Sequence, residues 1–259
     1  MRMMKKVLGT VTVLALSVSL LAGCGSTAAS PVSSAASTAA ESTTSSIVSE
    51  TTSAAADENV AAAAQLLNDL TGSYQELWPV ILADEYQQTW LDDCAALVGE
   101  ENAEAAFEKL SSMVTGDVYG EDAVEAYANG GGAYFCGFTN SLATLTFDGE
   151  TSTISGTDKD GNVLFSHTYH YIGMEPVHGL YEFESDDADS GEFTYFFLAP
   201  DTSAETYHIE FRYGSDAEAL SQYDAGEYAY WVASGISTDC DQTMIANCIE
   251  LFCTENLAG

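Results

Sequence analysis

The sequence predicts an α+β domain in which helices come first, a small antiparallel β-barrel follows, and further helices close the chain. Two observations favour this class. Apolar residues recur at helical spacing up to about residue 128, whereas after Gly130-Gly131-Gly132 they alternate with a period of two. Short turn-like links such as Asp148-Gly149 separate the alternating segments, which is typical of strands that pair in chain order.

Four helical segments are expected before the glycine run. The first follows Asp57, a good N-cap, and reaches about Leu70. A second helical pattern begins after Gly72 and extends to about Val98, with Pro79 expected to mark a helix start inside it. Two more amphipathic segments follow, Asn102–Val114 and Glu121–Ala128.

The strands expected after the glycine run are short and follow one another closely, so we expect a meander that curls into a barrel. They are Ala133–Phe138, Leu142–Phe147, Ser152–Gly156, Val163–Ile172, Gly179–Glu184, Glu192–Leu198 and Glu205–Tyr213. Two helices are expected after them, Asp216–Tyr223 and Asp241–Asn256. With no internal repeat and no second linker, residues 57–259 are expected to form one domain.

The N-terminus has the pattern of a bacterial lipoprotein signal peptide. A basic start with Arg2, Lys5 and Lys6 precedes the apolar run Val7–Leu21. Leu21-Ala22-Gly23-Cys24 then matches the processing box, so we expect residues 1–23 to be removed and Cys24 to carry lipid. Residues 24–56, mostly Ser, Thr and Ala, are expected to be a flexible tether. The domain is therefore expected on the extracytoplasmic face of the cell membrane, held there by the lipid alone.

The expected mature chain is strongly acidic. Only Lys109, Lys159 and Arg212 remain against 40 Asp and Glu residues once the signal is removed. Nucleic acid and anionic lipid headgroups are therefore poor partners, whereas cations are favoured. An exported chain also favours disulfides among the five cysteines after Cys24. These are Cys94, Cys136, Cys240, Cys248 and Cys253. Cys248 and Cys253 lie about 140° apart around one helix and are not expected to pair.

Catalytic motifs are absent from the sequence: there is no nucleophile elbow, phosphate-binding loop, dinucleotide fingerprint or His-Glu-x-x-His helix. The segment Asp158-Lys159-Asp160-Gly161 resembles the start of a calcium loop, but Tyr169 stands where the closing Glu is needed, so a hairpin turn is expected. We therefore expect a binding protein rather than an enzyme.

The strand expected at Glu205–Tyr213 carries the candidate metal ligands. Period two places His208 and Glu210 on one face, roughly 7 Å apart at Cα, so both side chains can reach one cation. Imidazole nitrogen and carboxylate oxygen suit zinc or a similar divalent metal. Alternatively, Glu210 pairs with Arg212. His170 or His178 could complete a site; His167 and His170 face opposite ways, so at most one of them joins.

The segment Tyr207–Asp216 and the helix after it resemble the ZinT family of exported zinc- and cadmium-binding proteins and the C-terminal domain of AdcA-type zinc lipoproteins. Three further matches follow in the same order as in that family, so the resemblance extends from about Leu70 to Asp216. They are Leu70–Pro79, Leu180-Tyr181-Glu182-Phe183-Glu184 and Ala199-Pro200. The family has a calycin-like barrel with helices, in agreement with the fold predicted above.

The resemblance implies a divalent-metal-binding protein, with zinc as the metal and a metal ABC transporter as a partner. His208 stands at the first family ligand, Glu210 at the second, which is His in the family, and Phe196 at the third. Exchange of His for Glu and loss of a ligand should weaken binding or shift the metal preference. If metal ligation is lost, the alternative is a calycin-type scaffold that binds a small apolar ligand or a protein.

Overall fold

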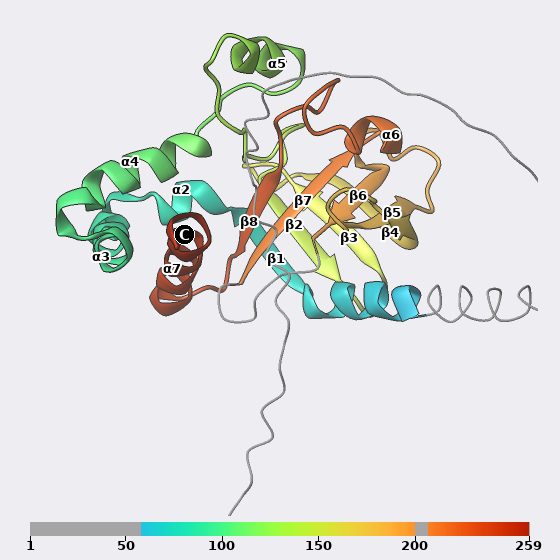
Figure 1. Ribbon diagram of the computed structural model, residues 1–259. Helices are drawn as coiled ribbons and strands as arrows, with labels where there is room; N and C mark the ends of the chain where they lie inside the picture. Colours follow the sequence, from blue (N-terminus) through green and yellow to red (C-terminus); the bar gives the residue numbers. More distant parts are fainter. Residues whose placement is uncertain (1–57, 200–206, 259) are drawn as a thin grey trace, which may run out of the picture.

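The computed structural model describes residues 58–199 and 207–258. The signal peptide, Cys24, the tether and the Asp57 cap lie outside the described residues. In the described part a β-barrel stands beside an arm of helices, which Figure 1 shows as two adjoining bodies. No helix of the described residues is long and apolar enough to cross a membrane. The predicted α+β class, with a calycin-like antiparallel barrel and helices before and after it, is confirmed.

Eight strands of the described residues form a closed antiparallel barrel in chain order, so each strand pairs with its neighbours in sequence and β1 pairs with β8. The strands are β1 (Gly72–Glu76), β2 (Thr144–Asp148), β3 (Thr153–Thr157), β4 (Val163–Met174), β5 (Tyr181–Ser185), β6 (Tyr195–Leu198), β7 (His208–Gly214) and β8 (Ala233–Ser237). The predicted meander is therefore confirmed for six of its seven expected strands, and β1 and β8 are added at its two ends.

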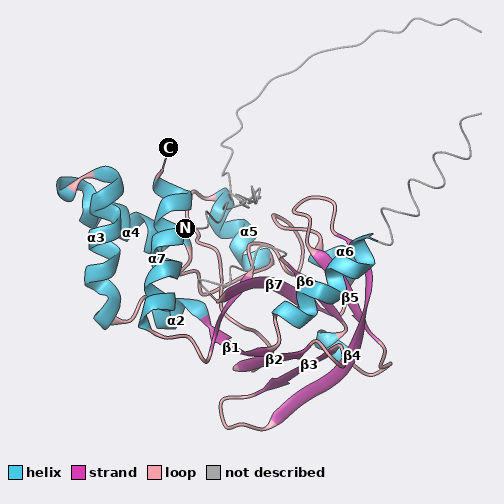
Figure 2. Ribbon diagram, turned by 90° about the horizontal axis from the view of Figure 1, so that it is seen from below, coloured by secondary structure: helices cyan, strands magenta, loops and turns pink. Residues whose placement is uncertain are grey.

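The helices divide between two places. An N-terminal helix, described over residues 58–69, packs Ala63, Leu66 and Leu67 against the barrel core. The other helices are α2 (Leu77–Ile81), α3 (Gln87–Val98), α4 (Ala103–Met113), α5 (Glu121–Ala128), α6 (Ala217–Leu220) and α7 (Gln242–Leu257). Short 3-10 turns lie at Asp84–Tyr86, Glu100–Asn102 and Gly191–Phe193. Figure 2 shows α2, α3, α4 and α7 gathered into an arm at one side of the barrel.

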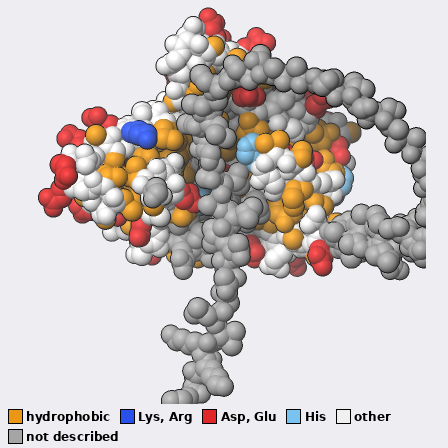
Figure 3. Space-filling model, viewed as in Figure 1, with side chains coloured by type: hydrophobic (Ala, Val, Ile, Leu, Met, Phe, Trp, Pro, Cys, Tyr) orange, Lys and Arg blue, Asp and Glu red, His pale blue; other side chains and the backbone are white. Residues whose placement is uncertain are grey.

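Two apolar cores hold these parts together. The barrel interior is filled by fully buried aromatic side chains, among them Phe147, Phe183, Phe196, Phe211 and Trp231. The arm has its own core, built around Trp90, Leu110 and Ile249. Acidic side chains are scattered over the visible surface, and a group of them lies at the outer end of the arm (Figure 3).

Two expected elements are wrong, and each has a physical reason. Gly72–Glu76 forms β1 rather than the start of a helix; Tyr74 points into the barrel core, and the helix begins at Leu77. The segment 133–138 is not a strand, because Phe135 alone bridges to Thr115 and Trp231. Its backbone instead pairs with the segment before β8, where Phe135 bonds to Tyr230 and Val232.

Strand β8 has no counterpart among the expected strands. Its sequence, Ala233-Ser234-Gly235-Ile236-Ser237, shows no alternation because all five residues are buried. The barrel core covers one face, where Ala233 lies, and the arm covers the other, where Ile236 lies. A strand buried on both faces loses the period-two signal.

Candidate functional site

Strand β7 places His208 and Glu210 on the outer face of the barrel. Ile209, Phe211 and Tyr213 point inward and belong to the barrel core, as the alternation predicts. His208 lies beside Ile236 of β8, and Glu210 lies beside Ser234. The outer face at this point is covered by the helical arm, so both side chains are half-buried rather than exposed.

A groove between β7 and the arm contains both residues. It is lined by His208 and Glu210 from β7, by Leu77 and Trp78 from α2, and by Cys248, Leu251, Phe252 and Glu255 from α7. We call this the β7–α7 groove. Its free volume is only about 30 Å³, enough for an ion or a water molecule but not for an organic ligand. Glu255 thus brings a second carboxylate to the groove.

A larger cavity of about 290 Å³ adjoins the groove, and Trp78, Glu210, Phe252 and Glu255 line both. Its remaining walls come from the end of α4, from α5, from the segment after the glycine run, from the start of β8 and from the end of α7. The aromatic residues that line it are Trp78, Tyr127, Tyr134 and Phe252. The two carboxylates therefore stand at the junction of a narrow groove and an apolar-walled cavity.

Two thiols border these spaces, Cys136 in the cavity and Cys248 in the groove. Burial, with a smaller contribution from the charge of Glu210, raises the pKa of each thiol to about 12. Both are therefore protonated at neutral pH. The two thiols therefore bring no thiolate to these spaces, and the carboxyl groups there are those of Glu210 and Glu255.

Arg212 does not take part in the groove. Its side chain is fully buried, and its guanidinium donates hydrogen bonds to the carbonyl oxygens of Leu220, Gln222 and Tyr228. These bonds hold the positive charge against α6 and the segment that follows it. The guanidinium is therefore bound away from the β7–α7 groove, whose lining does not include Arg212.

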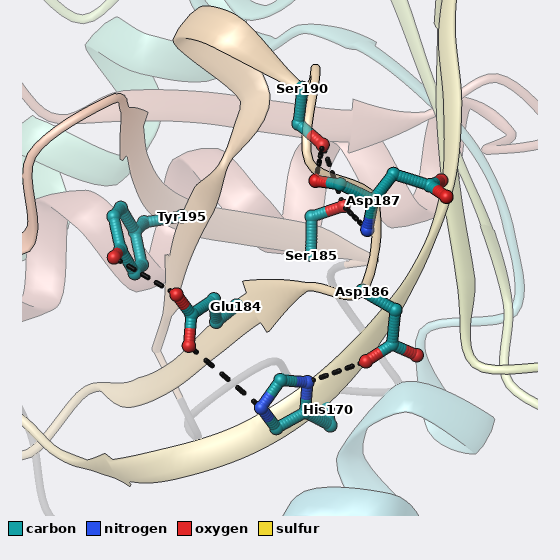
Figure 4. A network of polar contacts seen from close by, with 7 residues as sticks. All are labelled: His170, Glu184, Ser185, Asp186, Asp187, Ser190 and Tyr195. Carbon is teal, nitrogen blue, oxygen red and sulfur yellow. Dashed lines mark hydrogen bonds and ion pairs between the residues drawn. The ribbon is translucent and has the colours of Figure 1, made fainter.

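His170 lies elsewhere, on the outer face of β4. Its Nδ1 is 2.8 Å from an oxygen of Asp186, and its Nε2 is 3.8 Å from an oxygen of Glu184 (Figure 4). Tyr195 donates to the other oxygen of Glu184 at 3.0 Å. The ring is thus held between two carboxylates at the β5–β6 end of the barrel.

His178 and His167 have partners of their own. The Nδ1 of His178 is 3.6 Å from the buried carboxylate of Glu175, and its ring centroid is 3.8 Å from that of Tyr223. His167 points inward from β4, opposite to His170 as predicted, and its Nδ1 is 2.8 Å from Asp187. The structure therefore brings His208 together with Glu210 and places the other histidines in separate contacts.

Within residues 58–199 and 207–258, no three His, Cys, Asp or Glu side chains form a group that could hold a metal ion as they stand. Phe196, at the third ligand position of the resemblance, points into the barrel and packs on Tyr169, Phe211 and Tyr213. It lies on the opposite face of the sheet from His208 and Glu210. The sequence pattern did not identify Glu255, because its approach to β7 depends on how α7 docks.

No protein-family model matches the sequence, and no curated protein matches it. Among solved structures, the chain is similar to the Zn(II)-bound ZinT-like domain of Streptococcus pneumoniae AdcA, at 17% identity and a TM-score of 0.45. That match covers 71% of this chain and 89% of the other. It is also similar to Zn(II)-bound AdcA from the same organism, at 16% identity and a TM-score of 0.42. The second match covers 72% of this chain but 35% of the other.

Proposed function

We propose that this chain is a lipid-anchored, extracytoplasmic binding protein for a divalent metal ion, with zinc as the preferred metal. The observation that carries the proposal is the position of His208 and Glu210, side by side on β7 in a groove that α7 closes with Glu255. One imidazole and two carboxylates are a donor set that zinc accepts.

Metal capture in the groove requires the donors to approach one another, because the described residues hold no preformed group of three. His208 and Glu210 are fixed on a paired strand, whereas Glu255 is near the end of α7 and has a long, flexible side chain. The expected step is a swing of Glu255 toward the β7 pair as the ion enters. Ordering of that side chain reduces the affinity relative to a preformed three-histidine site.

Zinc calorimetry on the purified protein tests the proposal directly. The wild type is expected to bind one Zn²⁺, His208→Ala to lose most of the affinity, and Glu255→Gln to lose part of it. His170→Ala is the matched control, because it removes an imidazole from another outward-facing strand position. Absence of binding in the wild type, or equal affinity in His208→Ala and wild type, contradicts the proposal.

The lipid anchor rests on the Leu21-Ala22-Gly23-Cys24 box. The wild type is expected in the membrane fraction with a mass increase on Cys24, and Cys24→Ser is expected to lose both. A soluble, unmodified wild type contradicts this part of the proposal. Transfer of the ion to a metal ABC transporter is proposed as the following step, because an anchored domain that captures an ion needs a route for it across the membrane.

A second candidate function is suggested by the 290 Å³ cavity beside the groove. Ligand sites are concave, mostly apolar and of about this size or larger. Aromatic walls with Glu210 and Glu255 at one side suit a small apolar ligand that carries a positive charge. Among the described residues, the barrel interior is instead filled by aromatic side chains.

Titration with phenethylammonium and with the neutral analogue 2-phenylethanol separates this candidate from the first. The cation is expected to bind more tightly than the neutral analogue. Val114→Trp places a larger side chain in the cavity and is expected to abolish binding of the cation. Its zinc affinity is expected to equal that of the wild type. If neither the cation nor the neutral analogue binds to the wild type, the cavity is not a ligand site. The same conclusion follows if Val114→Trp binds the cation as tightly as the wild type does.

A further inference from the structure

Two buried cysteines face each other across the helical arm. Cys94 of α3 and Cys253 of α7 are both fully buried, and their Sγ atoms are 3.8 Å apart. Both residues belong to the core of the arm, where α3 packs along α7. At 3.8 Å the two sulfur atoms are close to van der Waals contact, and a disulfide requires them to approach to about 2 Å.

The other cysteines do not share this arrangement. All five lie in the described part of the chain, and the Cys94–Cys253 contact is the one recorded between cysteine sulfurs there. Cys248, on the same helix as Cys253, borders the β7–α7 groove instead. All five are free thiols in this structure, so the disulfides expected from the sequence are not formed in it.

We propose that Cys94 and Cys253 form a disulfide when the chain folds under oxidising conditions, and that this bond ties α3 to α7. The two positions are 159 residues apart, so the bond encloses every strand of the barrel from β2 to β8. A long enclosed segment restricts the unfolded chain strongly, which makes such a bond effective. The inference is independent of the metal proposal.

The reaction needs an oxidant that is itself a disulfide, such as glutathione disulfide or the active-site disulfide of a thiol oxidoreductase. The thiolate of one cysteine attacks the external disulfide and releases one thiol, leaving a mixed disulfide. The second thiolate then attacks the protein sulfur of that intermediate and releases the other thiol. Two protein thiols and one external disulfide thus become one protein disulfide and two external thiols.

The folded protein is a poor substrate for this exchange. Burial raises the pKa of both thiols, and the adjacent Asp93 carboxylate adds to the effect, so little thiolate exists at neutral pH. The bond is therefore expected to form while α3 and α7 dock, before the sulfurs are sealed from solvent. Once formed, it is expected to resist reductants until the arm unfolds.

The bond also bears on the groove, because α7 supplies both Cys253 and the groove residues Cys248 and Glu255. A cross-link from α7 to α3 limits how far α7 can move from the barrel. The melting temperature is expected to rise by about 5 to 15 °C in the oxidised form.

Refolding in a glutathione redox buffer, followed by mass spectrometry without reduction, tests the proposal. The oxidised wild type is expected to be about 2 Da lighter because two hydrogens leave, with peptides containing Cys94 and Cys253 joined. Cys94→Ala and Cys253→Ala are expected to lose the mass change, whereas the matched control Cys248→Ala keeps it. The peptide map of the wild type does not depend on whether any variant folds. An unchanged mass, or a map that joins another pair, overturns the inference.

Discussion

The guanidinium carbon of Arg212 lies 4.2 Å from the centre of the Tyr223 ring. His178 contacts the same ring, so Tyr223 connects the β4–β5 loop to the outer face of β7. Burial lowers the pKa of Arg212, yet its charge is retained because three carbonyl oxygens accept its hydrogen bonds. The contact fastens the segment after α6 to the barrel wall.

Arg212→Met is expected to destabilise the protein by about 3–5 kcal/mol, because three buried carbonyl oxygens lose their donor. Urea unfolding followed by tryptophan fluorescence measures the change. Lys159→Met is the control, since the Lys159 side chain is 84% exposed and should change stability by less than about 0.5 kcal/mol. Equal midpoints for the two variants would show that Arg212 has no such role.

Asp93 on α3 gives the protein a predictable response to pH. Burial, followed by the charges of Glu250 and Asp92, raises its carboxyl pKa above 3.8, and its Oδ2 is buried with no hydrogen-bond partner among the described residues. Over the interval from pH 3.8 up to the raised pKa, the folded state binds a proton that the unfolded state has released. This group's contribution to stability therefore falls as pH rises through that interval.

Asp93→Asn removes the loss of stability that the ionisation of Asp93 causes as pH rises. The variant is expected to be about 1 kcal/mol more stable than wild type at pH 7, with the difference shrinking toward pH 4. Urea unfolding between pH 4 and 7 measures it, and Glu108→Gln, at an exposed position of α4, is expected to leave the curve unchanged. A constant difference at every pH would mean that the titration of Asp93 is not the cause.

Phe196→His tests whether the third ligand position of the resemblance can be restored in this chain. Because Phe196 lies inside the barrel, the imidazole is expected to stay on the wrong face of the sheet for His208 and Glu210. Zinc affinity should be unchanged, while stability falls by about 2–4 kcal/mol from burial of a polar ring. Phe196→Leu is the control, because it separates the effect of lost volume from that of added polarity on stability. A gain in zinc affinity in Phe196→His would contradict the position of residue 196 inside the barrel.

Asp241 caps the helix that closes the β7–α7 groove. Its side chain accepts hydrogen bonds from the backbone N–H groups of Thr243 and Met244, at 2.9 and 3.0 Å. Asp241→Ala is expected to cost about 1 kcal/mol in unfolding free energy, because one or two donors at the helix start lose their partner. Asp239→Ala, at an exposed position just before α7, is the control; a comparable loss there would argue against capping as the cause.

Much of the fold could be predicted because the relevant signals are local. Helices that start at about Asp216 and Asp241, and the helix Glu121–Ala128, follow from short patterns, and the structure confirms them, although the first ends at Leu220 rather than Tyr223. The period of two in β7 correctly separated Ile209 and Phe211 from His208 and Glu210. Each of these features is set by residues within a few positions of one another.

The remaining features depend on contacts between distant segments. Gly235 and its neighbours form a strand because β7 and β1 pair on either side, not because of their own pattern. Glu255 joins the groove only when α7 docks on α2 and β7. Likewise, the contact of Cys94 with Cys253 spans 159 positions, so no local pattern could select this pair among five cysteines.

The pairing of β1 with β8 has a consequence for how the molecule is made. Tyr74 lies beside Ser237, so the barrel cannot close until nearly the whole domain has been synthesised. Contacts between such distant positions slow folding. Until β8 has been synthesised, the growing chain has unpaired strand edges. Folding of this domain is thus expected to be a late event, completed only when its C-terminal end becomes available.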